Sequence, residues 1–100
     1  MTGPVMGVEV TEATTQSITA GGTAQVVFAK NIARHTFFFC NTSDTLMYLR
    51  FHNSSDATTA LGIPVAVNGG TLILTGSACP TNRVTVLCSV IAKTFLAAEG

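Results

Sequence analysis

Short apolar runs alternate along the chain with polar or glycine-containing segments. The runs are rich in Val, Ile, Thr and Phe, the residue types that favour β-strands. No segment of ten or more residues shows a clear helical period, although AKNIARH could form a single turn. We therefore predict eight strands, at residues 15–20, 23–29, 36–40, 46–52, 63–67, 71–74, 83–92 and 95–98.

The segments between these strands carry turn-forming residues. AGGT and NGG supply glycine for tight turns, and NTSDT supplies side chains that can hydrogen-bond their own backbone. Seven or eight short strands at intervals of about 8–12 residues are typical of β-sandwiches and barrels. The sequence thus predicts an all-β, antiparallel β-sandwich of about eight short strands. The strand count suits a jelly-roll-like topology, and other Greek-key sandwiches remain open.

The chain is long enough for one domain. Residues 15–100 are predicted to form this single β-sandwich. Residues 1–14 hold Gly3, Pro4 and Gly7 among isolated apolar residues, which favours an extended N-terminal arm over a core strand. Simple terminal disorder is the alternative.

The segment FFFCNTSDTLMYLRF, residues 37–51, has two apolar runs around a short polar loop and is predicted to be a β-hairpin. Side chains alternate between the two faces of a strand, so three consecutive Phe residues cannot all point at one core. A one-residue slip of the register would exchange the two faces. The residues assigned to the core face are Phe37, Phe39, Met47, Leu49 and Phe51.

The second faces of the predicted strands are also half apolar, which a monomeric antiparallel sheet usually avoids. Clustered on a surface, such side chains would mark an interface; the alternative is that loops or the N-terminal arm cover them. Arginine suits an ion pair with a carboxylate of another subunit, whereas a solvated arginine would cover apolar surface with its stem. The candidate interface residues are Phe38, Tyr48, Arg34, Arg50, Ile73, Leu87 and Ile91.

The composition favours a subunit of an assembly. Charged residues make up 10% of the chain, against about 25% in a typical soluble domain. The formal net charge is zero, so copies of the chain do not repel one another. Five scattered Lys and Arg residues offer no basic patch for nucleic acid. No apolar run approaches the roughly 20 residues of a membrane span, and the N-terminus lacks a signal-peptide pattern.

Catalytic and metal-binding motifs are not found in the sequence. His35 and His52 do not stand in a metal-binding spacing, and Cys40, Cys79 and Cys88 include no C-x-x-C pair. No G-x-S-x-G nucleophile motif occurs. We therefore expect a non-enzymatic protein without cofactor or metal.

The order of several short motifs resembles a known group of proteins. NIAR precedes an apolar strand, N-x-S follows it, GIP and a GG turn come next, and F-x-A-x-E lies near the end of the chain. This order, over residues 20–100, resembles small virion proteins of tailed bacteriophages, of the capsid cement, decoration or head-fibre type. The matching residues are Asn31, Arg34, Asn41, Ser43, Gly62, Ile63, Pro64, Gly69, Gly70, Phe95, Ala97 and Glu99.

The resemblance implies a structural virion protein, made in the cytoplasm of a host bacterium. It would bind the outside of a phage capsid, with the major capsid protein and further copies of itself, as a dimer or trimer, as partners. The alternatives are a head-fibre, neck or tail accessory protein, or a host-surface or carbohydrate-binding module. The predicted loops 52–62 and 76–82 contain no aromatic residue, which counts against sugar stacking. A small enzyme or a cytosolic regulator is a remote third alternative.

Overall fold

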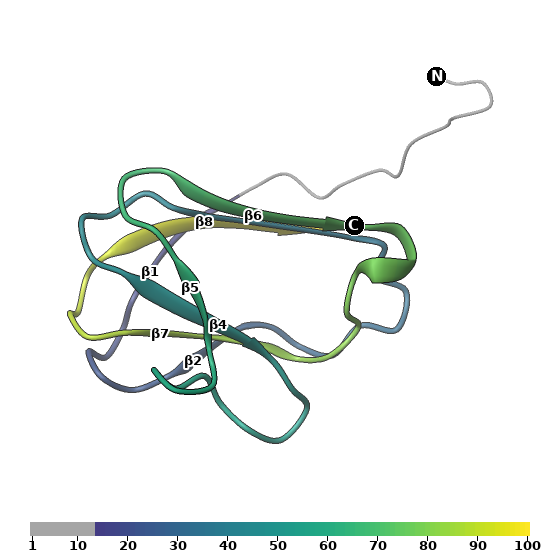
Figure 1. Cartoon of the computed structure of the whole chain (residues 1–100), viewed down its shortest axis with the longest axis horizontal. Helices are drawn as coiled ribbons and strands as arrows, with labels where there is room; N and C mark the ends of the chain where they lie inside the picture. Colours follow the sequence, from purple (N-terminus) through teal and green to yellow (C-terminus); the bar gives the residue numbers. More distant parts are fainter. Residues whose placement is uncertain (1–13) are drawn as a thin grey trace.

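The structure is a computed structural model and describes residues 14–100. Two four-stranded antiparallel sheets stack face to face, as Figure 1 shows, which confirms the predicted antiparallel sandwich of eight strands. The expected arm, residues 1–14, lies outside the described residues except for Thr14, which begins the first strand. The elements are β1 (Thr14–Ser17), β2 (Gln25–Phe28), β3 (Thr36–Asn41), β4 (Met47–Phe51), β5 (Ile63–Val65), β6 (Gly70–Thr75), η1 (Gly76–Ala78), β7 (Val84–Cys88) and β8 (Thr94–Glu99).

The strands pair in a nested order. One sheet, here called sheet A, has the order β1-β8-β3-β6, and the other, sheet B, has the order β2-β7-β4-β5. The first strand therefore pairs with the last, the second with the seventh, the third with the sixth and the fourth with the fifth. In Figure 1 sheet A forms the upper layer and sheet B the lower one. Most connections consequently cross from one sheet to the other.

The hairpin predicted for residues 37–51 is wrong. β3 pairs with β6 and β8, whereas β4 pairs with β5 and β7, so residues 42–46 cross between the sheets. A five-residue connection can span the roughly 10 Å that separate stacked sheets, and its turn chemistry resembles that of a hairpin loop. The NGG turn likewise connects strands of different sheets, β5 and β6.

The predicted division of faces is nevertheless confirmed. Phe37, Phe39, Met47 and Leu49 are buried, and Phe51 is partly buried against the same core. Phe37 packs edge-on against Phe51 across the sandwich, with ring centroids 5.1 Å apart. Whether a side chain points inward or outward depends on the alternation within its own strand. The direction can therefore be predicted correctly even when the partner strand is not.

The strand predicted at residues 83–92 is too long. β7 ends at Cys88, and the chain then turns, with Ala92 at a positive φ of 66°. The amide of Ala92 donates to the carbonyl of Ile18, which fixes this turn against the loop after β1. Ile91 is therefore 58% exposed in the β7–β8 turn and does not lie on a sheet face with Leu87.

Asn41 ties together the loops at one end of the sandwich. Its side chain is fully buried at the end of β3, and its Nδ2 donates to the carbonyls of Thr45 (2.9 Å) and Val65 (3.1 Å). Its Oδ1 accepts hydrogen bonds from the amide and the hydroxyl of Ser43. The backbone carbonyl of Asn41 accepts from the amide of Gly69 in the β5–β6 loop. Asn41 thus holds two connections between the sheets in place, the β3–β4 connection and the β5–β6 connection.

Candidate functional site

The outer face of sheet A carries an apolar centre. Phe38 lies between Ile73 of β6 and Ala98 of β8, and Cys40 lies beside Leu96. Ile73 is 61% exposed. Two predicted interface residues, Phe38 and Ile73, are therefore direct neighbours on one surface.

Hydroxyl-bearing residues surround this apolar centre. None of the outward-facing residues in the four described strands is charged. We call this surface the sheet A face. Thr36 and Ala98 belong to its register but are buried. Its outward-facing residues are Thr15, Ser17, Thr36, Phe38, Cys40, Thr71, Ile73, Thr75, Thr94, Leu96 and Ala98. An uncharged surface with an apolar centre is typical of a protein interface rather than of a solvated sheet.

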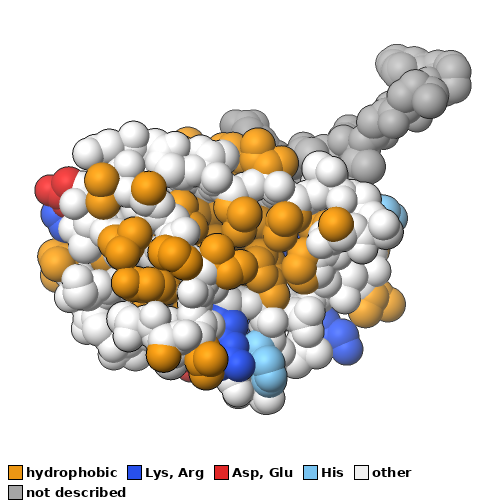
Figure 2. Space-filling view, viewed as in Figure 1, with side chains coloured by type: hydrophobic (Ala, Val, Ile, Leu, Met, Phe, Trp, Pro, Cys, Tyr) orange, Lys and Arg blue, Asp and Glu red, His pale blue; other side chains and the backbone are white. Residues whose placement is uncertain are grey.

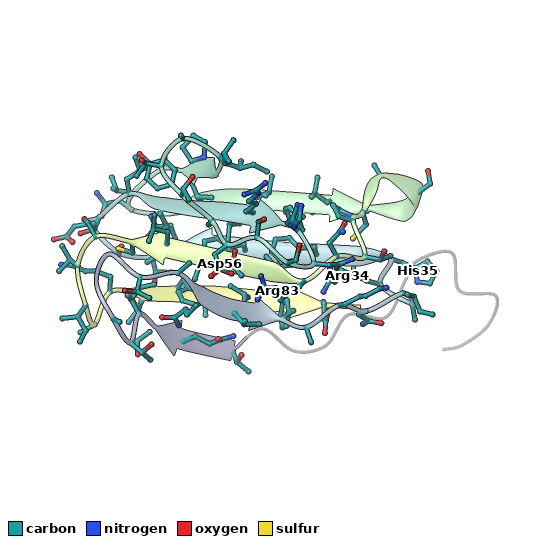
Figure 3. The ribbon with its side chains drawn as sticks, turned by 90° about the horizontal axis from the view of Figure 1, so that it is seen from below. Arg34, His35, Asp56 and Arg83 are labelled. Carbon is teal, nitrogen blue, oxygen red and sulfur yellow. The ribbon has the colours of Figure 1, made fainter. Side chains whose placement is uncertain are left out.

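The outer face of sheet B is half covered by the chain's own β4–β5 loop. The amide of Ala57 donates to the hydroxyl of Thr85 on β7 over 2.9 Å, and both residues are buried. Figure 3 looks onto this side, where Asp56 and Arg83 lie over the sheet. The alternative that a loop covers the second face therefore holds for this half of sheet B.

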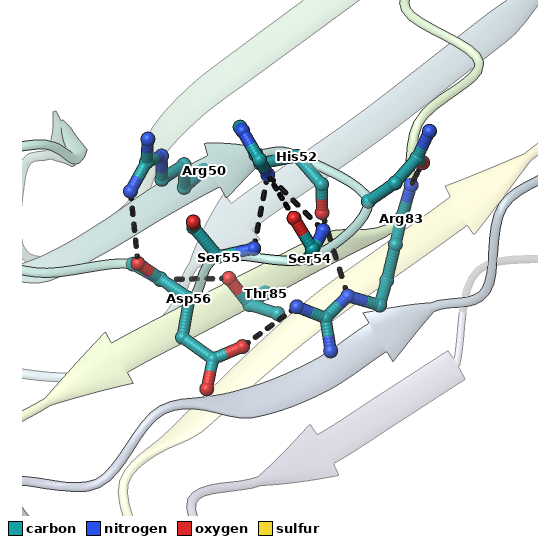
Figure 4. A network of polar contacts seen from close by, with 9 residues as sticks. Arg50, His52, Ser54, Ser55, Asp56, Arg83 and Thr85 are labelled. Carbon is teal, nitrogen blue, oxygen red and sulfur yellow. Dashed lines mark hydrogen bonds and ion pairs between the residues drawn. The ribbon is translucent and has the colours of Figure 1, made fainter.

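Polar contacts hold this covering loop closed (Figure 4). Nδ1 of His52 accepts hydrogen bonds from the amides of Ser54 (3.1 Å) and Ser55 (2.9 Å). Arg83 forms an ion pair with the carboxylate of Asp56 at 2.8 Å. The loop is thus capped by an imidazole in the way that an Asx turn is capped by a carbonyl oxygen.

Replacement of His52 by Ala is expected to loosen this loop, because two backbone amides lose their acceptor. We expect a loss of about 1–2 kcal/mol in the free energy of closing the loop. Hydrogen exchange at the amides of Ser54, Ser55 and Ala57 measures it. His52→Asn is the matched control, since its side-chain oxygen can still cap the turn, and it should retain most of the protection. Exchange in His52→Ala as slow as in the wild type would show that the ring nitrogen does not hold the loop.

Arg50 also contacts this loop from β4. Its Nη1 lies 3.4 Å from the carbonyl oxygen of Asp56 in the same chain. The side chain is half-buried beneath the loop and does not stand free on the sheet. This polar contact of Arg50 is therefore made within its own chain.

The uncovered half of sheet B contains a pocket of about 420 Å³. It brings together Tyr48 and Leu87, two of the predicted interface residues, on the neighbouring strands β4 and β7. Its other walls come from loops far apart in the sequence, which no local pattern could reveal. The lining residues are Gly22, Thr45, Leu46, Tyr48, Thr59, Leu87 and Ser89. None of them is charged.

The expectation that Arg34 pairs with another subunit is corrected by the structure. Its guanidinium is buried, and Nε lies 2.8 Å from a carboxylate oxygen of Glu99 in the same chain. Nη1 donates to the carbonyls of Pro80 and Asn82, and Nη2 donates to that of Ala29. Arg34 therefore holds together the loops after β2 and η1 and the last strand, at the end of the sandwich opposite Asn41.

Two ionisable groups have a pKa that departs from its ordinary value. Burial raises the pKa of the Cys79 thiol, so this cysteine stays protonated. The pKa of Asp44 is lowered by a hydrogen bond from Lys93, 2.7 Å away, and by another from Thr45. Cys40, in contrast, lies half-exposed on the sheet A face. It is therefore the cysteine best placed to react with a reagent in solution.

Two kinds of feature are absent from the described residues. Across residues 14–100, no three His, Cys, Asp or Glu side chains come close enough to hold a metal ion. In the same stretch, no helix is both long and apolar enough to cross a membrane.

The edge of the sandwich formed by β5 and β6 is apolar as well. Figure 2 shows hydrophobic side chains across the middle of this side, between the two layers. Leu72 and Leu74 of β6 are partly buried against the core, and Ile63 of β5 is 43% exposed. β5 has only three residues, so it covers only part of the gap between the sheets.

No family model, curated protein or solved structure matches the chain. The features that bear on function are therefore the sheet A face, the pocket on sheet B and the order of the sequence motifs.

Proposed function

We propose that this protein is a structural component of a bacteriophage particle, which binds the outside of the capsid and cements or decorates the lattice of the major capsid protein. The observation that carries the proposal is the sheet A face, where an uncharged surface surrounds the cross-strand neighbours Phe38 and Ile73. A second observation agrees with it: only 10% of the chain is charged. Both are typical of a subunit that functions against other subunits.

We assign the sheet A face to the shell. A four-stranded sheet offers a broad, gently twisted surface that can bridge a seam between capsid subunits. Each copy adds a modest buried area, but the icosahedral lattice repeats the site many times. Contacts between neighbouring copies would then add to the stability of the whole shell.

The nested strand order supports the proposed jelly-roll topology. A jelly roll results when one long hairpin, with four strands in each arm, rolls up into two sheets. Such a hairpin pairs β1 with β8, β2 with β7, β3 with β6 and β4 with β5, as observed here. The phage virion proteins that the motif order resembles also include capsid cement and decoration proteins with jelly-roll folds. The protein would accordingly be made in the host cytoplasm and reside on the capsid surface.

Purified virions test the proposal directly. Quantitative protein analysis and electron cryomicroscopy should find hundreds of copies distributed over the icosahedral shell, and particles that lack them should break at a lower temperature. A small copy number, as expected for a protein found only at the vertex that carries the tail, would place the protein at the neck or tail instead. Absence from the particle would refute the proposal.

Replacement of Ile73 by Lys tests the assigned face. We expect it to weaken binding to shells that lack the protein by at least about 100-fold, since a charge would be buried against an apolar partner. The control is Val26→Lys, which changes a residue that is 49% exposed on the outer side of sheet B. Binding is measured by co-sedimentation with shells, and equal loss in both variants would contradict the assignment.

Cys40 provides a second measurement on the unaltered protein, because it lies in the same face. Its thiol should react with a maleimide in the isolated chain and be protected on the particle. Equal labelling in both states would place the shell contact elsewhere.

A host-surface or carbohydrate-binding module is the second candidate. The ring of Tyr48 and the hydroxyls of Thr45, Thr59 and Ser89 in the pocket favour it. The lining provides neither a carboxylate nor a side-chain amide for paired hydrogen bonds with a sugar, which ranks this candidate second. Glycan-array screening of the isolated protein distinguishes the two.

A further inference from the structure

The pocket on sheet B has the chemistry of a site for a neutral, mainly apolar group. Its lining combines the apolar side chains of Leu46, Tyr48 and Leu87 with the hydroxyl-bearing residues Thr45, Thr59 and Ser89. A charged ligand would find no counter-charge among the lining residues. A cavity of about 150 Å³ already holds a benzene ring. The volume here, about 420 Å³, therefore has room for the tip of a polypeptide loop.

A loop tip of suitable chemistry occurs on the same chain. Ile32, between β2 and β3, is 81% exposed, the highest value among the large apolar side chains of the described residues. The turn that carries it is held by hydrogen bonds from the amide of Ala33 to Oδ1 of Asn31 (3.0 Å) and from the amide of Arg34 to the carbonyl of Asn31 (3.1 Å). An apolar side chain on a held turn loses little conformational entropy on binding.

The Ile32 turn and the pocket lie at opposite ends of the sandwich. The amide of Asn31 donates to the carbonyl of Thr81, shortly before β7 begins. The amide of Gly22, a lining residue of the pocket, donates to the carbonyl of Cys88, where β7 ends. In Figure 1 the β2–β3 loop lies at the right end and the β7–β8 turn at the left end. The Ile32 turn therefore cannot reach the pocket of its own chain.

We propose that the Ile32 turn of one copy inserts into the sheet B pocket of a second copy. This contact joins two different patches, so it is a heterologous, head-to-tail interface, which closes into a ring when the rotation permits. It rests on the self-association included in the proposed function and specifies the residues that produce it. The sheet A face takes no part in this contact and remains free for the shell.

Charges beside the two patches are complementary. Lys30 is exposed two residues before Ile32, and Asp44 is exposed next to the pocket residue Thr45. The contacts of Asp44 with Lys93 and Thr45 both use Oδ1. In the proposed contact, Oδ2 of Asp44 forms an ion pair with Lys30 of the second copy. This pair orients the approaching turn more than it adds affinity, because both groups lie at the rim.

A mixing experiment with the full chain tests the proposal. The wild-type chain should associate in sedimentation velocity, whereas Ile32→Asp and Leu87→Lys should each raise the apparent Kd at least about 100-fold. An equimolar mixture of the two variants should recover association but stop at a dimer, because one intact turn meets one intact pocket. Thr59→Trp serves as a second pocket variant, since Thr59 is an exposed loop residue and its replacement fills the pocket without disturbing a strand.

The matched control is Ile73→Asp, which places the same charge at another exposed isoleucine. It should associate like the wild type, although the proposed function predicts that it no longer binds shells. Association of Ile32→Asp like the wild type, a mixture that stays monomeric, or a wild-type monomer at about 1 mM would each overturn the inference. Failure of the proposed function is seen separately, as absence of the chain from virions, so the two outcomes are distinguishable.

Discussion

Replacement of Arg34 by Met is expected to lower the free energy of unfolding by about 3–5 kcal/mol, because it leaves a partly buried carboxylate and three backbone carbonyls without their donor. The guanidinium is bonded to Glu99, Pro80, Asn82 and Ala29, and its side chain is fully buried. A domain of this size is stable by about 5–15 kcal/mol. Urea unfolding should therefore show a large shift of the midpoint, with the slope unchanged.

Two variants test the geometry behind this value. Arg34→Lys keeps the charge but loses the planar fork, so it should still cost about 2 kcal/mol or more. Arg83→Met is the matched control, since the pair of Arg83 with Asp56 is largely exposed and should be worth less than about 1 kcal/mol. A cost for Arg34→Met no greater than that for Arg83→Met would contradict the proposed role.

Asn41→Asp is expected to be comparably destabilising, by about 3 kcal/mol or more. The change removes the two hydrogen bonds to the carbonyls of Thr45 and Val65 and sets a buried carboxylate oxygen against them. Thermal and urea unfolding at neutral pH measure the loss. The introduced carboxyl group is favoured in its protonated form in the folded state, so its pKa is raised there. Stability relative to the wild type should accordingly recover as the pH falls toward about 4 and below.

Asn53→Asp provides the control for Asn41→Asp. Asn53 is exposed, and its Oδ1 accepts a hydrogen bond from the amide of Arg83, which a carboxylate oxygen can also accept. We expect a change within about 0.5 kcal/mol and no recovery at low pH. Similar losses in both Asp variants would mean that the side-chain amide of Asn41 does not hold the loops.

The faces of the strands could be predicted because they follow from local alternation. Phe37 and Phe39 point inward and Phe38 outward, whichever strands lie beside β3. The same alternation indicated that Phe38 and Tyr48 do not belong to the core. The prediction that a second apolar surface exists therefore needed no knowledge of strand pairing.

The partners of the strands could not be predicted in the same way. The loop between β3 and β4 has the composition of a hairpin turn, yet it crosses between the sheets. Which strands pair depends on the total area that all eight can bury together, and no short segment carries that information. The pocket was missed for the same reason, since Gly22, Thr59 and Ser89 meet only after the strands of sheet B have paired.

The sequence by itself determined the number of strands, the inward and outward sides of each strand and the low charge of the surface. These properties depend on neighbouring residues and on composition, which are local or additive. Only the tertiary structure decided that Arg34 and Asn41 are internal clamps, that Arg50 lies under a loop and that Ile91 belongs to a turn. A long polar side chain is worth burying only when several acceptors converge on it, and that convergence exists only in the folded chain.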